Sequence, residues 1–178
     1  SDAPINSFAL SRDERRLALG IQVSTLDTDI WVRSLPDGAA SKLTFGPAPG
    51  WFMPVWSPDG SALAYATMDL AGQSGYEMRR KRSDMVGKEE TLLRTTGYVR
   101  PWDWSADGKW LVYTGEKQEL WLLPLVGEHT PTQFTKAPEE GTYGQLSTDG
   151  RWMAYASGDR SAPQIFVQPL PPTDARWL

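Results

Sequence analysis

A short pattern occurs four times along the chain, and this repetition limits the possible folds more than any other feature of the sequence. Each copy has a large apolar residue, then Ser, any residue and Asp, and three copies continue with Gly. The copies are Leu10–Glu14, Trp56–Gly60, Trp104–Gly108 and Leu146–Gly150. From one Asp to the next the spacing is 46, 48 and 42 residues. Repeats of about 40–50 residues are typical of propeller blades.

Three further apolar segments follow each copy and complete a unit of four short strands. The second segments are 16–20, 62–66, 110–114 and 152–156; the third are 29–32, 76–79, 119–122 and 164–167; the fourth are 42–45, 91–94, 132–135 and 175–178. The sequence therefore predicts an all-β chain, a β-propeller of four-stranded antiparallel blades. We place the blades at residues 5–46, 51–96, 98–136 and 142–178 of a single array covering 1–178.

The Ser-x-Asp-Gly element indicates a tight turn between the first and second strands. Ser and Asp side chains can accept hydrogen bonds from backbone N–H groups one or two residues on, and Gly tolerates a positive φ. In the first copy Glu14 replaces the Gly, so we expect that turn to be strained or changed. The second strands are apolar at nearly every position, which indicates sheets covered on both faces. The apolar residues before the Ser are expected to wedge between neighbouring sheets; they are Leu10, Trp56, Trp104 and Leu146.

The composition excludes several classes of function. The chain contains no Cys and a single His, and 18 Lys and Arg against 22 Asp and Glu give a net charge of −4. Disulfides, thiolate metal sites and Cys nucleophiles are therefore absent. An acidic chain with a pI near 5.0 does not bind nucleic acid through overall charge. The longest apolar stretch, 120–126, is too short to span a membrane, and we identify no signal peptide.

No motif in the sequence supports catalysis or metal binding. The segment 72–75 has half of a nucleophile-elbow pattern without its final Gly, and we interpret it as a loop. His129 lies in a predicted turn, where a solvated histidine is the ordinary case. Asp27 and Asp29 lack the spacing of a calcium loop and favour a turn at the entry to a strand. We assign no catalytic residue, no metal ligand and no cofactor.

One basic run, Arg79–Arg82, lies on the predicted third strand of the second repeat. Strand alternation sends Arg80 and Arg82 to one face and the other two cations to the opposite face, so a single basic patch is not expected. The acids Asp84, Glu89 and Glu90 follow closely and could neutralise the run. A solvated, charged outer strand is the favoured interpretation, and an anionic partner is the alternative.

The connections between repeats are the better candidates for a binding surface. Loops on a rigid scaffold commonly carry function, and Trp, Tyr and Arg dominate binding hot spots. The predicted loops are 46–54, 98–102 and 137–143. Prolines stiffen them and reduce the entropy lost on binding. The candidate binding residues are Trp51, Phe52, Arg100, Trp102, Glu140 and Tyr143, with packing between blades as the alternative role for some of them.

Two of the repeats resemble the "W-S-P-D-G-x-x-L-A-Y" unit of TolB-type β-propellers. They are Val55–Gly60 followed by Ala62–Tyr65, and Trp104–Gly108 followed by Trp110–Tyr113. More narrowly, four segments resemble the propeller that follows the membrane span of bacterial receptor-type serine/threonine kinases. These segments are Asp29–Val32, Leu43–Phe45, Tyr155–Ser157 and Ile165–Pro171. The resemblance implies a sensor or binding module outside the cytoplasm, in the periplasm or at the cell surface.

The resulting hypothesis is a non-catalytic propeller that presents one face to a protein, a peptide or a small ligand. An accessory gating propeller of a prolyl-oligopeptidase-like serine peptidase and a TolB-like periplasmic scaffold are the alternatives. We expect neither a nucleic-acid partner nor membrane contact by this chain. Four blades with two apolar end faces predict either a tight four-blade ring or two chains that join in an eight-blade ring.

Overall fold

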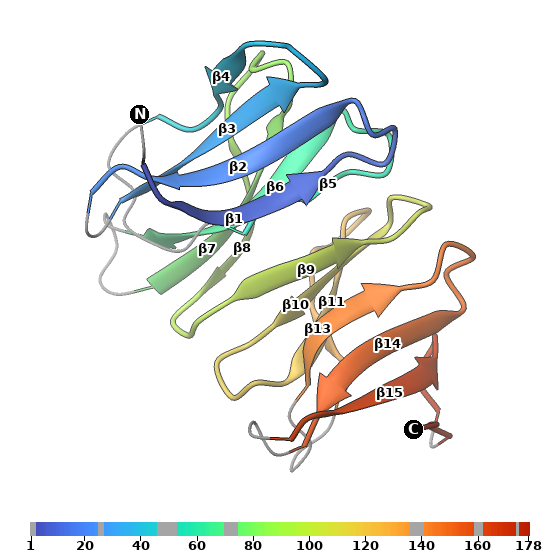
Figure 1. Cartoon of the computed structure of the whole chain (residues 1–178). Coiled ribbons are helices and arrows are strands. Elements are labelled where there is room, and N and C mark those ends of the chain that lie inside the picture. Colours follow the sequence, from blue (N-terminus) through green and yellow to red (C-terminus); the bar gives the residue numbers. More distant parts are fainter. Residues whose placement is uncertain are drawn as a thin grey trace. The chain divides into compact units, whose positions relative to one another are not determined.

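The computed structural model describes residues 3–24, 27–45, 53–69, 75–135, 141–158, 162–173 and 175–178. These residues form strands and turns without a helix, so the described part of the chain contains no helix able to cross a membrane. The chain divides into two compact units, Ser1–Pro101 and Trp102–Leu178. Figure 1 shows their strands in sequence colours.

The first unit contains two antiparallel four-stranded sheets, each with its strands in chain order. Sheet 1 consists of β1 (Ile5–Leu10), β2 (Arg16–Gln22), β3 (Thr28–Ser34) and β4 (Ala40–Lys42). Sheet 2 consists of β5 (Val55–Trp56), β6 (Ala62–Asp69), β7 (Gly75–Arg82) and β8 (Glu90–Thr95). Sequential antiparallel strands joined by tight turns form the blade that the repeat predicts.

The second unit contains the other two repeats, and the boundary between the units falls within strand β9. Sheet 3 consists of β9 (Arg100–Trp104), β10 (Trp110–Thr114), β11 (Leu120–Pro124) and β12 (Thr132–Gln133). Sheet 4 consists of β13 (Thr142–Leu146), β14 (Trp152–Ser157) and β15 (Gln164–Pro169). An antiparallel bridge between Val167 and Trp177 adds the end of the chain in the place of a fourth strand. The all-β prediction with four-stranded antiparallel blades is confirmed in the described residues.

The predicted turn is present in all four repeats with the same hydrogen bonds. In the second repeat, the Ser57 hydroxyl donates to Asp59 Oδ1 at 2.6 Å and accepts from the Ala62 N–H at 2.9 Å. The Gly60 N–H donates to the Ser57 carbonyl at 2.9 Å, and φ of Gly60 is 69°. The other copies, at Ser11, Ser105 and Ser147, repeat this arrangement.

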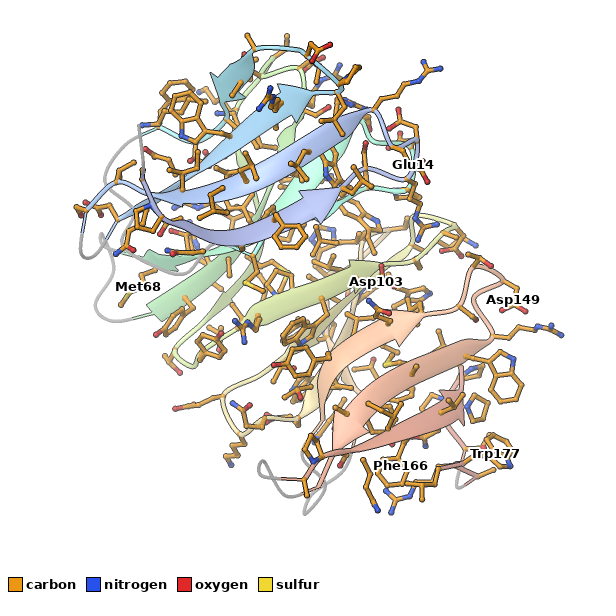
Figure 2. The ribbon with its side chains drawn as sticks, in the orientation of Figure 1. Glu14, Met68, Asp103, Asp149, Phe166 and Trp177 are labelled. Atoms are coloured by element: carbon orange, nitrogen blue, oxygen red, sulfur yellow. The ribbon has the colours of Figure 1, made fainter. Side chains whose placement is uncertain are left out.

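Glu14 occupies the glycine position of the first turn without changing its hydrogen bonds. Its N–H donates to the Ser11 carbonyl at 2.9 Å, as the glycines do in the other copies. Its φ of 57° is in the left-handed region, which costs an L-residue about 1–2 kcal/mol. The expected strain is therefore present while the turn type is kept, and Figure 2 labels Glu14 at this turn.

Each unit has its own core between its two sheets. In the first unit Ala18, Ile30 and Val32 of sheet 1 pack with Trp56, Leu63 and Tyr65 of sheet 2; Leu43 completes this cluster. In the second unit the core residues are Val112, Leu120, Leu122, Phe134, Met153 and Tyr155. Trp56 and Leu146 lie between sheets as predicted. The same expectation is wrong for Leu10, which is exposed because sheet 2 packs on the other side of sheet 1 in this unit.

Candidate functional site

The predicted binding residues do not form one loop cluster. Trp51, Phe52 and Glu140 lie outside the described residues. Arg100 and Trp102 belong to β9, and Tyr143 belongs to β13, so their placement in loops was wrong. The segment 98–102 was assigned to a connection between repeats, but Pro101 is compatible with a strand here because β9 is at the edge of its sheet, where proline is tolerated.

Arg100 and its neighbours form a small group within the first unit. The Arg100 Nη2 lies 3.7 Å from the Met53 sulfur, and Tyr98 meets Tyr76 edge to face with ring centroids 5.6 Å apart. Burial raises the pKa of the Tyr98 phenol above its ordinary value, outweighing the nearby charge of Arg100. A neutral, half-buried phenol beside aromatic and thioether groups indicates packing as the main role of this group.

Trp102 and Tyr143 are brought together in the second unit. Their ring centroids are 4.6 Å apart with the planes inclined at 47°. The Trp102 indole N–H donates to the Thr114 hydroxyl at 2.7 Å, and that hydroxyl donates to the Gly141 carbonyl at 3.1 Å. Trp102 is therefore held by its polar atom and also packs on the core of this unit. Tyr143 remains 61% exposed.

The backbone around Tyr143 explains its exposure. The register between β13 and β14 shifts between Thr142 and Gln145, which indicates a bulge. A Cβ at Gly144 would lie 2.7 Å from Val112 Cγ1, so only glycine fits against sheet 3 at this position. Tyr143 adopts a φ of 56°, which is unusual for a non-glycine residue. Bulges redirect side chains, and backbone strain of this kind often accompanies function.

We call Trp102, Thr114, Gly141 and Tyr143 the aromatic shelf. It offers a flat, partly fixed aromatic surface with a phenol hydroxyl, features suited to stacking and hydrogen bonding. It contains no acid, base or metal-binding side chain. Thr114, Gly141 and the neighbouring Gly144 were missed in the sequence because their role depends on packing between sheets. The adjacent pair Tyr143-Gly144 is the local signal that could have indicated a bulge.

The other residues singled out in the sequence form no catalytic or metal-binding arrangement within the described residues. No group of three or more His, Asp and Glu side chains there is arranged to hold a metal ion. Asp29 forms an ion pair with Lys42 at 2.8 Å, and His129 is half-buried in the connection between β11 and β12. Residues 72–74 of the partial nucleophile-elbow pattern lie outside the described part of the chain.

The basic run on β7 is paired with carboxylates, as its sequence context indicated. Arg79 contacts Glu77 at 2.6 Å and Glu89 at 3.0 Å, and Lys81 lies 3.8 Å from Glu89. On the other face, Arg80 contacts Glu90 at 2.6 Å and Arg82 contacts Asp84 at 2.5 Å. The four cations are split between the two faces and each has an acidic partner, so no single basic patch forms.

Comparison with solved structures identifies the fold. TolB from Acinetobacter baumannii superposes with a TM-score of 0.77 at 20% identity, over 96% of this chain and 42% of that one. A putative TolB from Agrobacterium tumefaciens gives 0.77 at 19% identity, over 96% and 64%. A prolyl endopeptidase gives 0.72 at 16% identity, over 97% and 28%.

The described sheets have the fold of TolB-type propeller blades, and the chain spans less than two thirds of these related structures. No protein-family model and no curated protein matches the sequence. At these identities the likeness concerns the fold alone.

Proposed function

We propose that this chain is a non-catalytic binding module that uses the aromatic shelf to hold a peptide or a segment of a partner protein. The observation that carries the proposal is the exposed Tyr143, held in a left-handed backbone conformation against the fixed ring of Trp102. A folded protein keeps such strain where the surrounding structure and function require it. The fold supports this reading because propellers are rigid scaffolds.

The chemistry of the shelf favours flat or weakly solvated groups. Proline rings, aromatic side chains and the guanidinium of arginine all stack on Tyr and Trp rings. Tyrosine contributes a large contact area with few rotatable bonds, so little entropy is lost on binding. Because Trp102 is already hydrogen-bonded through its N–H, only its ring is available for a ligand.

A random-peptide library displayed on phage tests the proposal, with selected peptides measured by calorimetry. We expect Tyr143→Gly to weaken binding at least tenfold, since loss of a hot-spot aromatic commonly costs 2 kcal/mol or more. The free energy of unfolding should change by less than about 1 kcal/mol, because relief of the left-handed backbone offsets the lost ring contact.

Two control variants make the result specific. Tyr143→Phe keeps the ring and should retain most of the affinity. Phe45→Ala removes an exposed aromatic side chain from the first unit and should leave peptide affinity unchanged. Selected peptides that bind the Tyr143→Gly variant as tightly as the parent protein would refute the shelf as the binding site.

The finer part of the proposal is a sensor module located outside the cytoplasm. It is motivated by the sequence resemblance to propellers of receptor-type serine/threonine kinases. The structural relatives include two TolB proteins and a prolyl endopeptidase. The two alternative roles are therefore a TolB-like scaffold and an accessory domain of a prolyl endopeptidase. The gene context and the localisation of the full-length protein distinguish them: a linked kinase domain and membrane span support the sensor, while a linked hydrolase supports the peptidase setting.

A further inference from the structure

One lysine of the first unit has a buried side chain whose ammonium group is not hydrogen-bonded. Lys81, on β7, pairs directly with Leu63 on β6, so both side chains point into the space between sheets 1 and 2. The Lys81 side chain is only 10% exposed. Among the described residues its ammonium makes no hydrogen bond, and its one ion pair is with Glu89 Oε1 at 3.8 Å. Burying a charged group costs free energy unless hydrogen bonds replace those lost to water.

Glu89 does not satisfy this ammonium because it is bound more closely by another cation. Glu89 Oε2 accepts a hydrogen bond from Arg79 Nη1 at 3.0 Å. Arg79 also contacts Glu77 at 2.6 Å, and Arg94 contacts Glu77 at 2.6 Å. This connected group contains three cations and two carboxylates, so one positive charge is in excess. Lys81 has the longest ion pair of the group and is therefore the cation that lacks a partner of its own.

An exposed aromatic ring lies beside the buried ammonium. Lys81 Nζ is 5.3 Å from the ring centroid of Phe45, and Lys42 Nζ is 5.7 Å from the same centroid. Lys42 is already paired with Asp29 at 2.8 Å, so its charge is balanced. Phe45 is 67% exposed. The ring therefore gives a ligand from solvent a flat apolar surface next to the unsatisfied charge of Lys81.

We propose that Lys81 and Phe45 form a binding site for a carboxylate attached to an aromatic or aliphatic group. The carboxylate accepts charge-assisted hydrogen bonds from the ammonium, and the apolar group packs on the Phe45 ring. A single negative charge matches the single excess positive charge, whereas a phosphate dianion exceeds it and is repelled by Glu89. A free organic acid and an acidic side chain of a peptide both present this chemistry. The inference does not depend on the aromatic shelf, which lies in the second unit.

Titration with phenylacetate, followed by NMR of the isotope-labelled protein, tests the site. We expect saturable binding in the millimolar range, as is usual for so small a ligand, with shifts of amide signals around Lys81 and Phe45. Lys81→Met removes the charge, keeps an apolar stem and should weaken binding at least about tenfold. Lys117→Met changes an exposed lysine of the second unit and should leave the affinity unchanged. Equal affinity of the parent protein and Lys81→Met overturns the proposal.

Analogues of phenylacetate separate the two parts of the site. Phenylacetamide lacks the charge and acetate lacks the ring, so each should bind at least about tenfold more weakly. Inorganic phosphate that binds as tightly as phenylacetate would contradict the preference for a carboxylate. A blocked Glu-Phe dipeptide distinguishes the two sources of the ligand. Displacement of phenylacetate by this dipeptide supports an acidic peptide, and no displacement supports a free acid.

Two further measurements distinguish the site from a structural ion pair and from the shelf. Lys81→Met should have a urea midpoint no lower than that of the parent protein, because Glu89 keeps its bond to Arg79. A lower midpoint together with unchanged phenylacetate binding would assign Lys81 to structural pairing. Phe45→Ala should weaken phenylacetate binding while peptides held by the aromatic shelf bind as before. Shifts confined to the surroundings of Trp102 would place phenylacetate on the shelf and contradict the proposal.

Discussion

At the scale of single residues, the turn Ser and Asp stabilise the turn in every repeat through their side-chain hydrogen bonds. The Ser hydroxyl accepts a backbone N–H from the following strand and donates to the Asp carboxylate, as at Ser57 and Asp59. The carboxylate also accepts a backbone N–H two residues on, from Ser61 in this repeat. All four Asp side chains are therefore committed to their turns, which is why a recurring carboxylate here is no sign of catalysis.

The glycine position of this turn supports a prediction about stability. Glu14→Gly should raise the free energy of unfolding by roughly 0.5–1 kcal/mol, because glycine adopts the positive φ without steric cost. The reverse change, Gly150→Ala, should lower it by about 1 kcal/mol, and no atom lies within 4 Å of the new Cβ to complicate the result. Urea unfolding followed by Trp fluorescence measures both. A loss of stability in Glu14→Gly, or a gain in Gly150→Ala, would show that backbone strain is not the controlling factor.

The turn carboxylates also make stability depend on pH. Hydrogen bonds from Ser57 and then from the Ser61 N–H lower the pKa of Asp59 from 3.8 to about 2, and bonds from Ser147 and Arg151 lower the pKa of Asp149 to about 2. A pKa below that of the unfolded chain stabilises the fold above about pH 4, and this contribution is lost as the pH falls toward 2.

Urea midpoints should therefore decrease between pH 5 and pH 2. The double variant Asp59→Asn, Asp149→Asn should show a smaller decrease, since its amides do not titrate while their oxygens still accept the turn hydrogen bonds. An equal decrease in both proteins would assign the acid sensitivity to other groups.

At the scale of a strand, β7 shows how a charged segment is accommodated inside a sheet. Glu77 is only 2% exposed and contacts Arg79 at 2.6 Å and Arg94, on β8, at 2.6 Å. Burial alone would raise the pKa of Glu77, but the hydrogen bonds from Arg79 and Arg94 outweigh it and hold that pKa below its ordinary value. The strand remains in the ladder because its buried charge is paired.

Removing the buried acid should cost more than removing an exposed one. Glu77→Ala should lower the free energy of unfolding by about 3 kcal/mol, because Arg79 loses its closest partner while partly buried. Glu90→Ala, which breaks the more exposed pair with Arg80, should cost less than about 1 kcal/mol. Chemical denaturation of the two variants provides the comparison. Similar losses would mean that the Glu77 pairs contribute no more than a surface pair.

At the scale of the whole molecule, burial changes from one repeat to another although the sequence pattern does not. Strand β6 is buried at every position from Ala62 to Thr67. On β2, Leu17 and Leu19 are only half-buried, while Ala18 between them is fully buried. A repeat module thus retains an apolar face even where the described sheets do not cover it, as expected for units that are stable only when stacked.

Most of the fold could be predicted from the sequence because it depends on short, local sequence patterns. Turn chemistry at Ser57 and Asp59 and the apolar second strands give strand order without long-range information. The candidate site was less predictable: Arg100 and Trp102 were placed in a loop and lie in a strand, since proline is compatible with both at a sheet edge. Whether the shelf binds a ligand stays a prediction.

The sequence by itself determined the repeat, its turns and the type of sheet, because these depend on residues within a few positions of one another. The tertiary structure decided which of the similar apolar faces are covered, and that Tyr143 is exposed while Trp102 is held. Equivalent positions such as Leu17 and Leu63 have the same side chain yet differ in burial, because burial depends on which sheet packs against them and not on the local sequence.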